Sequence, residues 1–388
     1  MPILKTAFWL AVAMVVYVYA GYPVLLAVWA RLRPRPIRAS PGAFTLPPVS
    51  IVLAARNEGL CLAARLQNLL ALDYPADRRQ IIVVSDGSTD GTEQVAADFI
   101  PAVELVVRPA LGKASALNAG VARARHAILV FADARQTFAP DAVRRLVRNF
   151  ADPSVGAVSG ELVLDCERTP GAAAESTIGD GVGLYWRYEK WLRRHESLVA
   201  STLGVSGAIY AMRRSCWRPL PPDTLLDDVL APMRVVLSGK RVVFDGSALA
   251  FDRTAPDASA ESRRKVRTLA GNYQLPWLEP ALLVPIVNPV WLQFVSHKLG
   301  RLLVPYALVV CLLTSAALAG EGLFYAAAFL AQIGLGLLAI YGAVLEGRAR
   351  RDRHRSEDRR SHRDPCHGSA PQRFGDGQPS STKRVVNA

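Results

Sequence analysis

The segment QIIVVSDGSTD, residues 80–90, decides how the chain folds. Its apolar half predicts a buried β-strand, which ends at Asp86 in an acidic turn with a glycine and leads into a helical pattern at 92–99. Residues 128–133 repeat this arrangement and end at Asp133. Ligands of open α/β sheets bind outside the carboxyl ends of the strands. The two carboxylates therefore predict a site for a nucleotide, a hydroxyl group or a metal ion, unless both are ordinary turn or capping residues.

Strands and helices alternate on both sides of this segment. The expected strands occupy residues 49–55, 81–85, 103–107, 128–132 and 155–164, and the expected helices occupy residues 58–72, 92–99, 113–124 and 140–150. Such alternation predicts an α/β fold built on a parallel, doubly wound sheet. Beyond residue 165 the pattern loosens into two expected helices, at 185–194 and 228–237, and a strand at 241–244.

Three uncharged stretches flank this region, at residues 7–30, 302–319 and 323–345. Each is long enough to be a membrane-spanning helix, and the first lacks the short apolar core and small-residue cleavage site of a signal peptide. The apolar stretch at 276–295 is broken by prolines, so we expect it to lie along the membrane interface. The charged residues 347–388 have no apolar period and predict a disordered tail.

Basic residues predict the orientation of these spans. Arginines follow the first span, Lys298 and Arg301 precede the second, and further arginines follow the third. Because positive charge stays on the cytoplasmic side, we expect a multi-pass inner-membrane protein with its N-terminus outside. The domain organisation predicted is a first span and linker at 1–48, a cytoplasmic α/β domain at 49–275, an interfacial segment with two spans at 276–346, and the tail.

The formal net charge of +13 invites a nucleic-acid interpretation. The positive charge lies mostly beside the predicted spans and in the tail, where anionic lipid is the expected partner, and no nucleic-acid-binding motif is present. The five cysteines have neither paired nor metal-ligand spacing. The sequence therefore predicts membrane association, no nucleic-acid partner and no structural zinc.

Six motifs in order resemble the catalytic domain of membrane-bound family 2 glycosyltransferases. They are VSIVLAARNEG (49–59), IIVVSDGSTDGT (81–92), GKASALNAGVARA (112–124), ILVFADARQTFAPDAV (128–143), SGAIYAMRR (206–214) and LLDDVLAPMRVVLSGKRVVF (225–244). This group includes synthases of poly-N-acetylglucosamine, chitin, hyaluronan and cellulose, and enzymes that glycosylate lipids. The resemblance implies a GT-A fold, which is a Rossmann-like nucleotide-sugar-binding domain, flanked by transmembrane helices. It also implies a nucleotide-sugar donor, a UDP-sugar in our interpretation, and inversion at the anomeric carbon.

The resemblance also assigns residues to the donor. Asn57 and Glu58 lie in the turn that borders the nucleotide, and Asp86 would accept hydrogen bonds from the base or ribose. Lys113 follows Gly112 at the start of a helix, where a helix N-terminus and an ammonium group both suit a diphosphate. The alternative roles are capping for the turn residues and a solvated lysine for Lys113.

Asp133 is the candidate ligand for Mg²⁺ or Mn²⁺. The family motif is commonly Asp-x-Asp, but here the second position is Arg135, whose guanidinium supplies no oxygen ligand. Two interpretations remain open. Asp133 and the diphosphate hold the metal while Arg135 contacts phosphate, or Arg135 replaces part of the charge of the metal.

Asp227 and Asp228 match the acidic pair of the family, in which the second residue is the base that removes the proton of the acceptor hydroxyl. The alternative for Asp228 is a helix cap. Arg267 matches the arginine of the Gln-x-x-Arg-Trp motif of processive relatives and would stabilise the leaving diphosphate. Arg264 replaces the glutamine and would join the donor site, while Thr268 replaces the tryptophan that lies against the acceptor sugar.

Three functions follow from these residues. The first is an inverting glycosyltransferase with a membrane-associated lipid or glycan acceptor, working in cell-envelope glycan synthesis. The second is a processive polysaccharide synthase, which the loss of the tryptophan and the few spans disfavour unless a partner protein completes a pore. The third is a non-catalytic membrane scaffold with a degenerate fold, which Arg135 favours slightly and the surviving acidic residues oppose.

Overall fold

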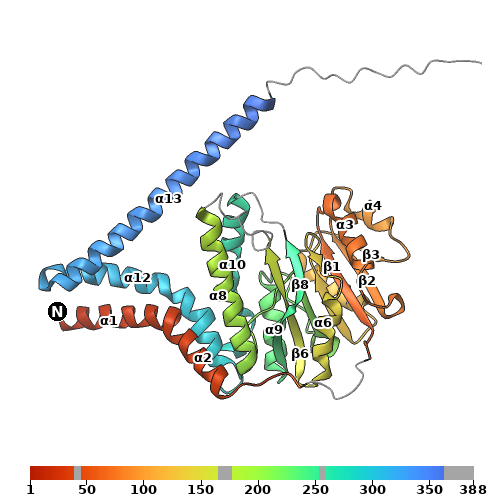
Figure 1. The fold of residues 1–388 in the computed structure, drawn as a ribbon, viewed down its shortest axis with the longest axis horizontal. Coiled ribbons are helices and arrows are strands. Elements are labelled where there is room, and N and C mark those ends of the chain that lie inside the picture. The colour runs from red at the N-terminus through yellow and green to blue at the C-terminus, as the bar shows by residue number, and fades with distance from the viewer. Residues whose placement is uncertain (39–44, 165–176, 253–257, 362–388) are drawn as a thin grey trace, which may run out of the picture. The chain divides into compact units, whose positions relative to one another are not determined.

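The computed structural model describes residues 1–38, 45–164, 177–252 and 258–361. These residues form two compact units, of which the larger runs from Thr6 to Val310 and the smaller joins Met1–Lys5 to the chain from Cys311 onward. The larger unit contains the sheet, and it is the part in which the predicted site lies (Figure 1).

The larger unit is built on one eight-stranded sheet with the order β3-β2-β1-β4-β7-β6-β8-β5. Its strands are β1 Val49–Ala55, β2 Arg79–Asp86, β3 Glu104–Arg108, β4 Ile128–Ala132, β5 Thr137–Phe138, β6 Val155–Leu164, β7 Ile209–Arg213 and β8 Arg241–Asp252. Strands β1 to β4 are parallel to one another, so the carboxyl ends of β1, β2 and β4 meet at one edge.

The second half of the sheet differs from the parallel sheet that the sequence predicts. Strand β7 pairs antiparallel with both β4 and β6, and β5 pairs antiparallel with β8. The sheet is therefore mixed. The apolar pattern of a buried strand carries no information on its direction, and β7 returns to the sheet only after a long helical excursion. The α/β fold itself is confirmed, with strands at each position where one is expected.

Helices cover both faces of the sheet. The helices that pack around it are α3 Gly59–Leu70, α4 Thr92–Ala97, α5 Lys113–Arg123, α6 Ala142–Arg148, α8 Thr177–Val199, α9 Asp227–Leu237 and α10 Ala258–Leu278. Ile51 and Leu53 of β1 face a core formed with α3 and α6, whereas Val52 faces a second core formed with α5 and α9. Because both faces are buried, the strands are almost continuously apolar.

Two helices of the structure differ from those that the sequence predicts. Helix α6 begins at Ala142 rather than Pro140, since Asp141 precedes it as the N-cap residue. Helix α10 was not expected, because its first half is charged and lacks a clear apolar period. In Figure 1, α8 and α10 lie side by side at one end of the sheet, away from α3 and α4.

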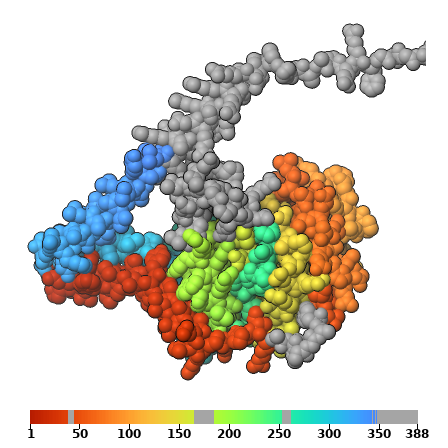
Figure 2. All heavy atoms as spheres, viewed as in Figure 1, coloured from red at the N-terminus to blue at the C-terminus, as the bar shows by residue number. Residues whose placement is uncertain are grey.

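Segments of the predicted spans that belong to the larger unit pack against its other helices. Tyr22, Leu26 and Ala30 of α2 Tyr22–Leu32 form a buried cluster with Leu192 and Val199 of α8. Figure 2 shows the red N-terminal segment against the green surface of α8. At the start of the later apolar helix, α11 Trp291–Gln293 continues into the π-helix η7 Phe294–Leu299 and then into α12 Gly300–Ala317. The first helix likewise consists of α1 Pro2–Val16, the π-helix η1 Tyr17–Gly21 and α2.

Three helices are long and apolar enough to cross a membrane: Pro2–Leu32, Trp291–Ala317 and Leu323–Gly342. They confirm the three apolar helices expected from the sequence. The second begins at Trp291. In the segment 276–295, which the sequence predicts to lie along the membrane interface, residues 276–278 complete α10, Pro280–Leu283 form a 3-10 turn, and the residues from 291 onward belong to this apolar helix.

The first part of the tail, which the sequence predicts to be disordered from residue 347, is helical in the structure. Helix α13 runs from Leu323 to Ser361, which takes in the start of the segment predicted as disordered. Residues 348–361 contain neither proline nor glycine and are rich in arginine, a good helix former, so the helix continues through them. The remaining residues, 362–388, lie outside the described part of the chain.

Candidate functional site

The loop that precedes α5 is organised by Asp86, at the end of β2. Asp86 is 4% exposed. Its carboxylate accepts hydrogen bonds from the backbone N–H of Leu111, at 2.8 Å, and of Gly112, at 3.0 Å. Gly112 has a φ of +89°, which favours glycine. Asp86 thus fixes the turn that presents the N-terminus of α5, beyond the nucleotide role predicted from the sequence.

Lys113 is the first residue of α5 and joins two carboxylates from different elements. Its Nζ lies 3.1 Å from Oδ1 of Asp133, at the end of β4, and 3.4 Å from Oδ2 of Asp227, at the start of α9. Burial opposes the charged lysine, but Asp227, Asp133 and Asp228 outweigh it and hold the pKa of Lys113 above its usual value. The structure therefore brings together four residues that the sequence predicts for the site: Lys113, Asp133, Asp227 and Asp228.

Asp227 and Asp228 occupy the first turn of α9. The residue that precedes the helix is Leu226, so neither aspartate is its N-cap. Burial and the neighbouring charge of Asp227 raise the pKa of Asp228 to about 6, although Lys113 opposes this shift. A carboxyl group with a pKa close to neutral is suited to exchange a proton during a reaction. Asp228 therefore remains the candidate for a general base, and it is not the residue that caps α9.

Asn57, Glu58 and Arg135 form the rim of the same sheet edge. Asn57 has a φ of 55°, which asparagine tolerates well, and its Oδ1 accepts a hydrogen bond of 2.8 Å from the N–H of Thr89. Nε of Arg135 lies 3.5 Å from Oε1 of Glu58. Arg135 is thus directed to the turn after β1, and its ion pair in the described structure is not with Asp133.

The two predicted arginines of α10 differ in their surroundings. Arg267 donates a hydrogen bond of 3.1 Å to the carbonyl of Leu225, just before the acidic pair. A Cβ on Gly271 of the same helix would lie 2.4 Å from Leu226, so α10 packs closely on this loop. Arg264 is exposed and lies about one turn before Arg267 in the same helix.

Sequence reasoning missed Tyr210, in the middle of β7. Its ring stacks on Phe131 of β4, with centroids 4.4 Å apart, and its buried hydroxyl has no hydrogen-bond partner in the described structure. Burial, then Asp227, Asp228 and Asp133, raise the pKa of Tyr210 well above its usual value. The hydroxyl therefore faces the acidic cluster. The motif SGAIYAMRR could have indicated it only if the antiparallel pairing of β7 with β4 were known.

The cluster fits a divalent cation. Asp133 and Asp227 converge on one point, because a single ammonium group reaches both, and Oδ2 of Asp227 is buried without a hydrogen-bond donor. Carboxylate oxygens are the ligands that Mg²⁺ and Mn²⁺ prefer, and Mg²⁺ usually completes its shell with water and substrate phosphates. No group of three or more metal-binding side chains occurs among the described residues, so the phosphates of a donor would have to supply the remaining ligands.

Comparison with known proteins agrees with this geometry. Residues 50–215 match the family model described as Glycosyl transferase family 2. The chain is 36% identical over 118 residues to the beta-monoglucosyldiacylglycerol synthase of Synechocystis, an alignment that covers 29% of this chain and 25% of the synthase. It is 34% identical over 118 residues to the poly-beta-1,6-N-acetyl-D-glucosamine synthase of Staphylococcus epidermidis, covering 29% of this chain and 28% of that protein.

Among solved structures, the mannosyltransferase PcManGT of Pyrobaculum calidifontis, in complex with GDP-Man and Mn²⁺, superposes with a TM-score of 0.64. The match covers 85% of this chain and 92% of that one, at 23% sequence identity. This likeness shows that the two share a fold. Residues 50–215 are therefore similar to family 2 glycosyltransferase domains, and the chain has the fold of a GT-A glycosyltransferase, as the sequence motifs predict.

Proposed function

We propose that this chain is an inverting glycosyltransferase that transfers a sugar from a nucleotide-sugar, a UDP-sugar in the first instance, to a lipid acceptor at the membrane. The observation that carries the proposal is that Nζ of Lys113 lies 3.1 Å from Asp133 and 3.4 Å from Asp227 at the carboxyl ends of the strands. Asp228 follows Asp227 directly and acts on the pKa of Lys113. Cations and carboxylates in this arrangement suit a diphosphate, a metal ion and a base.

The reaction follows from these roles. Asp228 takes the proton of the acceptor hydroxyl as its oxygen forms a bond to the anomeric carbon. The bond between that carbon and the diphosphate breaks on the opposite face, and the nucleoside diphosphate leaves with the electron pair. Lys113 and Arg267 would stabilise the charge on the leaving diphosphate. Asp133, with Asp227, would hold a divalent cation, which neutralises phosphate charge when bound.

Three features support a lipid acceptor. Helices long and apolar enough to cross a membrane precede and follow the domain. Thr268 stands where processive relatives have a tryptophan against the acceptor sugar. The lipid-glycosylating synthase of Synechocystis is among the relatives, although only part of each chain is matched. A processive synthase that works with a partner protein is the second candidate.

The function is tested with the purified full chain in lipid nanodiscs, with radiolabelled UDP- and GDP-sugars and either Mg²⁺, Mn²⁺ or a chelator. We expect a chloroform-soluble labelled product that requires the metal. A water-soluble polymer of high molecular weight made by the chain alone would contradict the lipid acceptor and support a polysaccharide synthase. The absence of product from every donor would favour the scaffold.

We also propose that the domain at 49–275 faces the cytoplasm, where nucleotide-sugars are made. The distribution of basic residues around the apolar helices supports this orientation. In a variant whose five cysteines are replaced by serine, Gly320→Cys should react with a membrane-impermeant thiol reagent in intact cells, and Leu60→Cys, fully exposed on the domain, should react only after lysis. The opposite labelling pattern would refute the orientation.

A further inference from the structure

One face of α8 carries a row of charged residues toward the start of the second apolar helix. Glu189, Arg193 and Glu196 are spaced by four and three positions, so they share one side of the helix. Nδ1 of His297 lies 2.6 Å from Oε1 of Glu196, and Arg301 pairs with Glu189. These contacts place η7 and the first turn of α12 directly against that side of α8.

The carboxylates of this row already have partners. Oε1 of Glu196 also accepts a hydrogen bond of 2.9 Å from the hydroxyl of Tyr22, and Glu189 faces both His297 and Arg301. Arg301, then, is neutralised. Two half-buried cations of the same interface, Arg193 and Lys298, have neither an ion pair nor a hydrogen bond to any described residue.

These two cations lie near the catalytic base. Nε2 of Gln293, directly before η7, donates a hydrogen bond of 3.3 Å to the carbonyl of Ser201, and in the loop that follows Ser201 the N–H of Val205 donates one of 2.9 Å to the carbonyl of Asp228. Consistent with this position, Lys298 and Arg193 both lower the pKa of Asp228, after the larger effects of burial, Asp227 and Lys113. Lys113, by contrast, is held by Asp133 and Asp227 at the strand ends.

The base is therefore flanked by two cationic positions. The first, at Lys113, suits the diphosphate of the donor. The second lies at the start of the apolar helix Trp291–Ala317, which is long enough to cross a membrane and would bring a lipid headgroup to this position. A half-buried cation without a partner is costly, and an anionic ligand removes that cost. An arginine and a lysine together bind phosphate well, the first through paired hydrogen bonds and the second as a point charge.

We propose that Arg193 and Lys298 bind a phosphate group of the acceptor lipid and thereby hold its reacting hydroxyl next to Asp228. This inference rests on the proposed function, and it narrows the acceptor to lipids whose headgroup carries phosphate, as against neutral diacylglycerols. In an inverting transfer the acceptor and the leaving diphosphate occupy opposite faces of the sugar, and two separate anion sites around one base match this requirement.

The test measures binding rather than transfer. Dioctanoyl phosphatidate and dioctanoylglycerol are titrated into the purified full chain in detergent micelles, followed by calorimetry. We expect the chain to bind the phosphatidate and to bind the glycerol at least about tenfold more weakly, the size of a lost charge-assisted contact. Lys298→Gln and Arg193→Gln should each weaken phosphatidate binding about tenfold, while the affinity for UDP stays unchanged and shows that the variants are folded.

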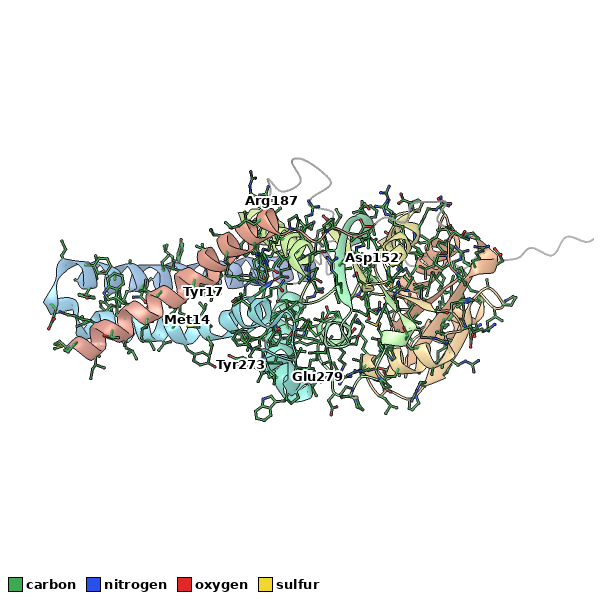
Figure 3. All side chains as sticks on the ribbon, turned by 90° about the horizontal axis from the view of Figure 1, so that it is seen from below. Met14, Tyr17, Asp152, Arg187, Tyr273 and Glu279 are labelled. Carbon is green, nitrogen blue, oxygen red and sulfur yellow. The ribbon has the colours of Figure 1, made fainter. Side chains whose placement is uncertain are left out.

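Arg187→Gln is the matched control. Arg187 is exposed on α8, on the side of the helix away from Arg193, and Figure 3 shows it at the edge of the domain opposite Tyr273 of α10. This variant should bind phosphatidate like the unchanged chain. Equal affinity for the two lipids, or phosphatidate binding that Lys298→Gln and Arg193→Gln leave intact, would overturn the inference. A chain that binds phosphatidate through these residues but glycosylates no lipid would keep the phosphate site, and would refute both its role in holding an acceptor and the proposed function.

Discussion

Replacing Asp228 by asparagine is expected to lower kcat for sugar transfer by about 10²–10⁴-fold, the usual contribution of a general base. The amide cannot take the proton of the acceptor hydroxyl, whereas the shape of the side chain is kept. Affinity for UDP, measured by calorimetry, should change little, because Lys113 is held mainly by Asp133 and Asp227. In the unchanged enzyme, activity should rise with pH through about 6, since the base acts only when deprotonated.

Asp141→Asn is the control for this experiment. Asp141 also lies at the start of a helix, where it precedes α6 and pairs with Arg145 at 2.6 Å, far along the chain from the acidic pair. Asparagine is as good as aspartate at a helix N-terminus. If Asp228 had only a structural role at the start of α9, the two asparagine variants would behave alike. Near-normal turnover in Asp228→Asn would show that the base lies elsewhere.

Much of the donor half of the site could be predicted from the sequence. Asp86 and Asp133 end two apolar runs, and parallel strands that alternate with helices bring such ends to one edge of a sheet. Lys113 begins the helix that follows. The proximity of these residues depends on local pattern and on the regular geometry of consecutive β-α units, both of which can be read along the chain.

The acceptor half could not be predicted in the same way. Tyr210 reaches the cluster because β7 runs antiparallel to β4, and strand direction leaves no mark in the apolar pattern. Lys298 lies at the interface with α8 because η7 packs against that helix, a tertiary contact between segments far apart in the sequence. From the sequence alone, Lys298 was one of the basic residues that indicate membrane orientation.

The position of Arg135 also required the structure. The loss of the second carboxylate left two roles open, both of them directed at phosphate or at the charge of a metal. In the structure its Nε lies 3.5 Å from Oε1 of Glu58, at the rim of the sheet edge. Asp227, from a distant helix, shares the ammonium group of Lys113 with Asp133, and we propose it as the second carboxylate for a metal ion.

Replacing Lys113 by glutamine is expected to weaken binding of the nucleotide-sugar by about 10- to 100-fold, because one charge-assisted contact to the diphosphate is worth ~1.5–3 kcal/mol. The same change should move the pH dependence. Lys113 opposes the rise in the pKa of Asp228 that burial and Asp227 cause, so its removal raises that pKa further above about 6. The pH at which residual activity is half-maximal should therefore shift upward, toward the alkaline side.

The two effects of Lys113→Gln are measured by calorimetry with UDP and by initial rates between pH 5 and pH 9 at saturating donor. Lys240→Gln serves as the control, since its Nζ donates a hydrogen bond of 2.8 Å to the carbonyl of Pro153, in a loop before β6 and away from the acidic residues. A solvated lysine at position 113 would give unchanged affinity and an unchanged pH profile. Weaker donor binding without the alkaline shift would leave Lys113 as a diphosphate ligand but would disprove its electrostatic link to Asp228, because Lys113 is the largest of the charges that lower the pKa of the base.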